Sequence, residues 1–189
     1  KELVISLGRR VYVIGVDIVK PDYEFTNGEF VQLDFNNPRL VDDFLEENKG
    51  SFDAVFSIEV IEHVQDPWKY VSDLNLLLKD KGLLFITTPN IQNWLSRFLF
   101  LLNGRLLQFA EKDLSYGHVT PIGDWQLKLI LENNNFKHIE ISTVGKFGPI
   151  CKSSFKLLLL SMILLPFRFL FKGKKDGWCI LARANKFKV

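Results

Sequence analysis

The stretch from residue 52 to residue 90 constrains the fold more than any other part of this sequence. Its first apolar run, 53–58, alternates too little to have one wet face, which predicts a strand buried on both faces. An aspartate and a proline at 66–67 predict a helix start, and apolar residues recur at helical spacing until Gly82. Residues 83–88 predict a second buried strand. Strand, helix and strand in this order predict half of a doubly wound α/β sheet.

A polar turn separates the first of these strands from the helix. It carries three ionisable side chains, Glu59, Glu62 and His63. If the turn is helical, their offsets of zero, three and four place all three side chains on one face. Sheets of this kind bind ligands at the carboxyl ends of their strands, which here carry residues 57–63 and 87–90. The turn is therefore either part of a binding site or a solvated connection in an ordinary β-α-β unit.

The composition fits one globular domain over residues 1–189. Hydrophobic residues make up 47% of the chain, with 17 phenylalanines, enough for a substantial core. The net charge of +2 is too close to neutral to argue for a nucleic-acid partner, and we expect none. Cys151 and Cys179 are far apart and form no ligand-spaced pair, which favours a reduced, cytoplasmic compartment.

The remaining elements follow the same α/β pattern. Residues 11–16 and 30–33 predict two strands, and residues 38–48 and 124–133 predict helices. Residues 136–144 predict a further strand. The last strand is expected over residues 178–183.

The stretch 52–90 resembles the class I S-adenosylmethionine-dependent methyltransferases, especially the bacterial group that includes the ubiquinone-biosynthesis O-methyltransferases. In that family a strand like FDAVFSIEVIEHV is followed by a helix that starts with proline and by a strand like GLLFITTPN. The resemblance is close in this stretch, and looser but in the same order over most of the chain. It implies a Rossmann-like doubly wound sheet whose last two strands form an antiparallel edge. It also implies S-adenosylmethionine (SAM) as the methyl donor.

The resemblance further implies cofactor contacts at the ends of three strands. The residues concerned are Asp17, Ile18, Asp34, Phe35, Ser57, Ile58 and Glu59. Asp17 would accept hydrogen bonds from the ribose hydroxyls. Asp34 would accept a hydrogen bond from the adenine amino group, with Phe35 beside the ring. Taken alone, each aspartate would be interpreted as an ordinary strand-end or turn carboxylate.

Methyl transfer is a direct displacement in which positioning supplies most of the acceleration. An oxygen acceptor must also lose its proton, and His63 is a candidate general base, with Glu62 and His118 beside it in the expected catalytic site. Some relatives carry an E-x-x-E-H turn that ligates a divalent metal. By that resemblance Glu59, Glu62, His63 and His118 would hold magnesium or manganese. The alternative is that the glutamates favour the positive start of a helix while His63 caps or packs locally.

Family members hold the methionyl part of the cofactor with a glycine-rich turn after the first strand, and this sequence contains no such turn. Residues 1–10 predict the helix that follows that turn, with a strand over 3–7 as the competing interpretation. We therefore expect the fold to lack the first strand and its glycine-rich turn. We also expect the parent protein to bind SAM and the 189-residue chain to bind it poorly or not at all.

Two apolar helical insertions are expected, at about 91–110 and 152–172. The first is either a lid over the site or a packed insertion. Within the second, residues 155–171 are too short and too interrupted to span a membrane. With the basic residues 172–175 nearby, this segment is expected to make peripheral membrane contact, or else to form a hydrophobic subdomain or a dimer surface.

Together these observations predict methyl transfer from SAM to an oxygen of a small or lipid-linked acceptor. The expected location is the cytoplasm, with peripheral contact at the inner face of the membrane. The alternative is a non-catalytic, membrane-associated or dimerising module that retains the fold. An RNA acceptor is disfavoured by the near-neutral charge.

Overall fold

The structure is a computed structural model that describes residues 11–22, 27–145, 154–174 and 176–187. The helix expected over residues 1–10 lies outside the described residues. The chain divides into two compact units, residues 1–47 and residues 48–189. Each unit has its own sheet.

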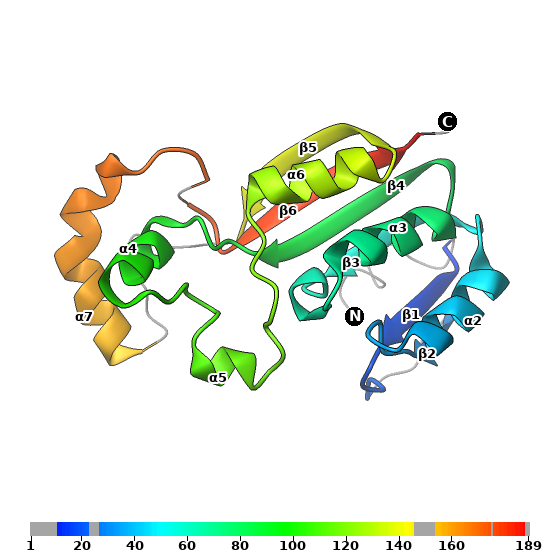
Figure 1. The fold of residues 1–189 in the computed structure, drawn as a ribbon, viewed down its shortest axis with the longest axis horizontal. Coiled ribbons are helices and arrows are strands. Elements are labelled where there is room, and N and C mark those ends of the chain that lie inside the picture. The colour runs from blue at the N-terminus through cyan, green and yellow to red at the C-terminus, as the bar shows by residue number, and fades with distance from the viewer. Residues whose placement is uncertain (1–10, 23–26, 146–153, 175, 188–189) are drawn as a thin grey trace. The chain divides into compact units, whose positions relative to one another are not determined.

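The first unit contains a two-stranded parallel sheet. Strand β1 (Val13–Asp17) pairs with strand β2 (Gly28–Gln32), and helix α2 (Pro38–Asn48) follows (Figure 1). Gly28 stands directly opposite Val13, and a Cβ atom at residue 28 would lie 1.9 Å from the Val13 carbonyl oxygen. Only glycine therefore allows the two strands to approach so closely where their pairing begins.

The second unit contains a four-stranded mixed sheet in the order β3-β4-β6-β5. Its strands are β3 (Phe52–Ile58), β4 (Leu78–Pro89), β5 (Phe136–Val144) and β6 (Cys179–Lys186). Strands β3 and β4 run parallel, while β6 is antiparallel to both of its neighbours. The α/β fold class and the antiparallel edge expected from the sequence are confirmed.

Helices α3 (Pro67–Leu77) and α6 (Asp124–Asn133) cover one face of this sheet (Figure 1). The first of them begins where the sequence predicts, because the Asp66 carboxylate accepts hydrogen bonds from the amides of Trp68 and Lys69, at 3.0 Å each. The buried core between helices and sheet includes Leu74, Leu77, Leu84, Ile86, Leu127, Ile130, Leu131, Ile180 and Ala182.

A second hydrophobic cluster joins the two apolar insertions. It is built by α4 (Trp94–Asn103), by α7 (Phe155–Leu164) and by Phe171, which directly follows the 3₁₀ helix η3 (Leu165–Leu170). Its fully buried members, Trp94 and Leu95, pack against Phe98, Leu99, Leu107, Leu157, Leu164 and Phe171. Within the described part of the chain, none of the helices combines the length and apolar character that crossing a bilayer requires.

Two expectations about the central stretch are wrong. Within the part of the chain that the structure describes, β3 is buried on one face only, because α3 and α6 cover that face and Phe56 and Ile58 on the other remain 41% and 56% exposed. Helix α3 does not continue to Gly82. It ends at Leu77, since Leu78 is extended and pairs with Phe52 as the first residue of β4.

Candidate active site at the carboxyl ends of β3 and β4

The turn after β3 departs from the helical turn expected over residues 59–63. Glu59 has a positive φ of 53°, and its amide donates to the carbonyl and the hydroxyl oxygens of Thr87, at 3.2 and 3.1 Å. This residue therefore extends the pairing of β3 with β4, and only the 3₁₀ turn η2 (Ile61–His63) is helical. The condition under which Glu59, Glu62 and His63 would share one helical face is therefore not met.

Glu62 is fully buried, although it carries an ionisable carboxyl group. One oxygen, Oε2, accepts a hydrogen bond from the Thr88 hydroxyl at 3.1 Å. The other, Oε1, has no hydrogen-bond partner among the described residues. Burial, with a smaller contribution from the charge of Glu59, raises the pKa of Glu62 to about 7. A buried carboxyl group with one unpaired oxygen is suited to receive a proton or a cation.

His63 and His118 meet edge to face beside this carboxyl group. Their ring centroids are 4.7 Å apart and the ring planes are 86° to each other. Burial, followed by the proximity of His118, lowers the pKa of His63, so its neutral form is favoured. His118 Nδ1 lies 2.8 Å from the Gln108 carbonyl oxygen, which can only accept. The Nδ1–H therefore donates, and the Nε2 lone pair of neutral His118 stays available for a ligand.

Backbone hydrogen bonds hold the loop that carries His118 against the turn after β3. The amides of Val119 and Thr120 both donate to the Glu62 carbonyl oxygen at 3.0 Å. Gly117 has a φ of 88°, and a Cβ atom there would lie 3.1 Å from His63 Nδ1. Glycine thus permits both the backbone conformation and the close approach of the loop to the His63 ring.

Three of the four predicted metal ligands come together in this arrangement. Glu62, His63 and His118 each offer one ligand atom, and these atoms lie within 4.8 Å of one another. Glu59 is not part of this group, although its charge contributes to the raised pKa of Glu62. One carboxylate oxygen and two imidazole nitrogens form a donor set that fits a divalent transition-metal ion.

The two aspartates predicted to bind the cofactor lie in the first unit. Asp17 is the last residue of β1, and Asp34 follows β2 by two residues. Because β1 and β2 are parallel, both aspartates lie at the carboxyl edge of that sheet. Asp17 Oδ1 accepts from the Val19 amide at 3.0 Å and Asp34 Oδ1 accepts from the Asn36 amide at 2.9 Å, so each carboxylate is oriented by its own turn.

The other predicted cofactor contacts have different surroundings. Ile18 and Ile58 are exposed, and Phe35 is half-buried. The buried Ser57 hydroxyl forms a 2.8 Å hydrogen bond with the Tyr70 hydroxyl of α3. The Ser57 side chain therefore points into the helix-covered core, and any cofactor contact at this position would come from its backbone.

Cys179 is a further residue of this edge that the sequence interpretation did not place here. As the first residue of β6 it stands opposite Pro89, the last residue of β4. Burial, and then the charge of Glu59, raise the pKa of its thiol to about 12, so the thiol remains protonated at neutral pH. Its position could have been anticipated only from the antiparallel register of β4 and β6.

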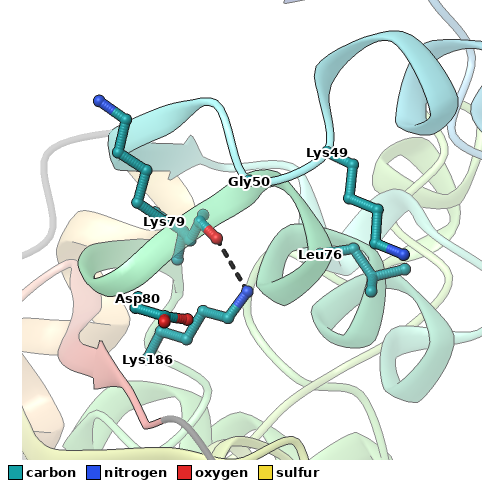
Figure 2. A pocket seen from close by; sticks show the side chains of 7 residues that line it. Lys49, Gly50, Leu76, Lys79, Asp80 and Lys186 are labelled. Carbon is teal, nitrogen blue, oxygen red and sulfur yellow. Dashed lines mark hydrogen bonds between the residues drawn. The ribbon is translucent and has the colours of Figure 1, made fainter.

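A separate hollow of about 460 Å³ opens at the opposite end of β3 and β4 (Figure 2). Its lining includes Lys79 and Lys186, whose amines already have partners. Lys186 Nζ donates to the carbonyl oxygens of Asn75 and Leu78 at 2.8 Å, and Lys79 Nζ pairs with Asp53 at 2.9 Å. Parallel strands of this type of sheet bind ligands at their carboxyl ends, so we place the active site at the Glu62 edge.

Parallel strands that end in ionisable side chains, beside an antiparallel last strand, agree with the class I methyltransferase fold. A family model described as a methyltransferase domain matches residues 4–141. The chain therefore belongs to the methyltransferase domain family, of the SAM-dependent class. This membership disfavours the alternative of a non-catalytic module.

Individual relatives agree with this assignment. The chain is 36% identical over 91 residues to a ubiquinone biosynthesis O-methyltransferase of Xanthomonas campestris, a match that covers 47% of this chain and 38% of that protein. A SAM-dependent methyltransferase structure from Archaeoglobus fulgidus superimposes with a TM-score of 0.59 at 19% identity, covering 92% of this chain and 75% of the other. A Bacillus halodurans protein assigned as a methyltransferase gives a TM-score of 0.56 at 15% identity, with 94% and 84% covered. At these identities the two structures show the fold alone.

Proposed function

We propose that the protein transfers the methyl group of SAM to an oxygen atom of a small or lipid-linked acceptor at the Glu62 edge of the sheet. The observation that carries this proposal is the meeting of Glu62, His63 and His118 at the carboxyl ends of two parallel strands in a methyltransferase fold. The O-methyltransferase relative from Xanthomonas supports the choice of oxygen.

Proton removal from the acceptor hydroxyl is the first task of these residues. His63 suits it, because its lowered pKa leaves the imidazole neutral near pH 7 and ready to accept a proton. Glu62, one of whose oxygens is held by Thr88, is fixed beside the ring and takes part in holding the proton once it is transferred. His118 is oriented by Gln108 and presents its Nε2 atom to the same space.

Cofactor binding is assigned to the carboxylates of the first unit. Asp17 and Asp34 lie at one edge of the β1–β2 sheet, which suits hydrogen bonds with the ribose hydroxyls and the adenine amine of SAM. SAM supplies the activated methyl group. The chain's own residues supply position and proton acceptance.

A divalent cation fits the same three side chains. Glu62 offers an oxygen with no hydrogen-bond partner among the described residues, and the tautomer of His118 leaves Nε2 free to ligate. Two imidazoles beside one carboxylate favour manganese over magnesium. When bound, such an ion would lower the pKa of the acceptor hydroxyl and orient it. His63 would then act as a ligand and not as the base.

Methyl transfer from tritiated SAM to a panel of simple phenol, amine and thiol acceptors tests the proposal in the full-length protein. We expect label on the phenol only. Labelling of amines or thiols in preference would contradict the oxygen acceptor. The same assay after treatment with EDTA decides the metal: lost activity that manganese restores supports the ion, while unchanged activity removes it and leaves His63 as the base.

A further inference from the structure

Helix α7 presents an apolar face to solvent. Phe155, Leu159, Met162 and Ile163 follow the spacing of one helical face, and all four are exposed, with Phe155 at 73% and Ile163 at 68%. The opposite face, including Leu157 and Leu164, packs in the cluster with α4. A helix that covers a core in water has a polar outer face, and α7 has an apolar one.

Neighbouring segments extend this apolar surface. Helices α4 and η3 both contact α7, and each carries three large exposed apolar side chains (Figure 1). We call the whole set the apolar cap; its members are Phe100, Leu101, Leu102, Phe155, Leu159, Met162, Ile163, Phe167, Phe169 and Leu170. An apolar surface built from two segments far apart in the sequence indicates an interaction site, whereas isolated exposed apolar residues are ordinary.

The two segments that carry the apolar cap contain basic residues but no acidic ones. Residues 94–110 and 154–174 contain six basic residues and no aspartate or glutamate, although the chain as a whole has 24 basic and 22 acidic residues. One of the six, Arg168, pairs with Asp176, just outside the second segment. Three of the bases, Arg105, Lys156 and Lys172, are exposed. An apolar surface that carries these exposed bases is complementary to an anionic lipid surface.

A second copy of the chain fits the same surface less well. A two-fold interface would bring the same bases of both copies to one contact, with no acidic side chain of these segments to pair with them. In contrast, phosphate groups at a bilayer surface would pair with each base while the aromatic and aliphatic side chains enter the boundary of the acyl chains.

We propose that the apolar cap docks the protein on the surface of an anionic lipid bilayer, with Arg105, Lys156 and Lys172 at the phosphate headgroups. The helices lie in the interface and do not cross it, in agreement with their length. This docking does not depend on the proposed methyl transfer.

Hydrogen bonds connect the segment that follows the apolar cap with the edge of the sheet that carries the candidate active site. The Asn90 side-chain amide, directly after β4, donates to the carbonyl oxygens of Lys174, Asp176 and Gly177 at 2.9, 3.0 and 3.1 Å. These bonds tie the chain after η3 to the carboxyl edge of the sheet, where Glu62 lies. Docking would therefore bring that edge close to the bilayer, which suits a lipid-linked acceptor; this last step alone rests on the proposed function.

Sedimentation of the protein with vesicles tests the docking. We expect binding to vesicles of mixed phosphatidylcholine and phosphatidylglycerol that weakens as salt rises, and little binding to phosphatidylcholine alone. The double variant Met162→Asp, Ile163→Asp is expected to lower partitioning by about tenfold or more, because charged side chains resist the interface. The matched control Trp125→Asp, Leu129→Asp changes two exposed apolar residues of α6 and is expected to leave it unchanged.

Two basic residues give a second, independent variant. Lys156→Gln with Lys172→Gln is expected to reduce binding to anionic vesicles by about tenfold or more, whereas Lys69→Gln with Lys128→Gln removes the same charge elsewhere and has no such effect. Near-UV circular dichroism confirms that each variant remains folded. Failure of the unaltered protein to sediment with anionic vesicles would overturn the proposal. It would also be overturned if the two double variants in the apolar cap bound these vesicles as well as the unaltered protein does. A dimer in solution that the Met162→Asp, Ile163→Asp variant dissociates would assign the surface to a second copy instead.

Discussion

The Glu62 carboxylate accepts a hydrogen bond from the Thr88 hydroxyl at 3.1 Å, which joins the turn after β3 to the end of β4. Oxygen Oε2 is thereby committed, and Oε1 is left without a hydrogen bond among the described side chains. Neighbouring strands thus hold one oxygen of a buried carboxyl group in place and leave the other for a proton or a cation. This orientation is the property on which the proposed chemistry depends.

Removing the hydroxyl group that orients Glu62 should lower the rate of methyl transfer without abolishing it. Thr88→Val keeps the side-chain shape and deletes the donor, so we expect activity to fall about tenfold, as for other groups that orient a reacting side chain. Steady-state kinetics measures the change. Thr143→Val in β5 is the control, and an equal loss in both variants would show a general effect on folding instead of a specific one.

The stability of the metal-free protein should depend on Glu62 in a defined pH range. Its pKa is raised from 4.5 to about 7, so the folded state retains a proton that the unfolded state has lost. The contribution of Glu62 to the free energy of unfolding should therefore be greatest below pH 4.5 and decrease as the pH rises to about 7, by up to a few kcal/mol. Urea unfolding in EDTA at several pH values measures this trend.

Glu62→Gln is expected to remove that trend, because glutamine does not titrate. Glu132→Gln, at an exposed position of α6, should retain it. A trend that persists in Glu62→Gln would assign the titration to another group.

His63 should set the acidic limb of the pH–rate profile in the metal-free reaction. Its pKa is lowered from 6.5 by burial and by His118, so the neutral, proton-accepting form persists at lower pH than in a free histidine. We expect kcat/KM to rise with pH through a midpoint below 6.5 and then to level off. His63→Gln should lower the rate and abolish this limb. The same limb in that variant would exclude His63 as the base.

Gly117 and Gly104 form a matched pair that separates backbone strain from contact with the site. Both have positive φ values, 88° and 69°, but only at Gly117 would a Cβ atom approach His63 Nδ1, at 3.1 Å; at Gly104 the space is open. Alanine at either position should cost on the order of 1–2 kcal/mol in stability. Only Gly117→Ala is expected to reduce activity as well, measured at a temperature where both variants are folded.

Much of the fold could be predicted because its signals are local. The cap at Asp66, the proline after it and the apolar periodicity beyond define the start of α3 from neighbouring residues alone. The end of α3 was harder, since the extended conformation of Leu78 results from its pairing with Phe52 across the sheet. Tertiary pairing prevailed there over the local glycine signal at residue 82.

The sequence indicated which side chains could meet at this candidate site, but not how they are arranged. The E-x-x-E-H turn and the later histidine were visible in the sequence, whereas the left-handed conformation of Glu59 depends on hydrogen bonds with Thr87. Likewise, His118 reaches His63 because amides of its loop bind the Glu62 carbonyl oxygen. Such contacts link residues more than 25 positions apart, and no local pattern encodes them.

The most direct measurement of the central claim is the rate of methyl transfer by His63→Gln and Glu62→Gln at saturating SAM. The account predicts that kcat falls by about a hundredfold or more, as expected when a general base or its partner is lost, while the dissociation constant of SAM stays close to that of the unaltered protein. Full activity in both variants would contradict the account, because it would show that the reaction proceeds without the edge formed by β3 and β4.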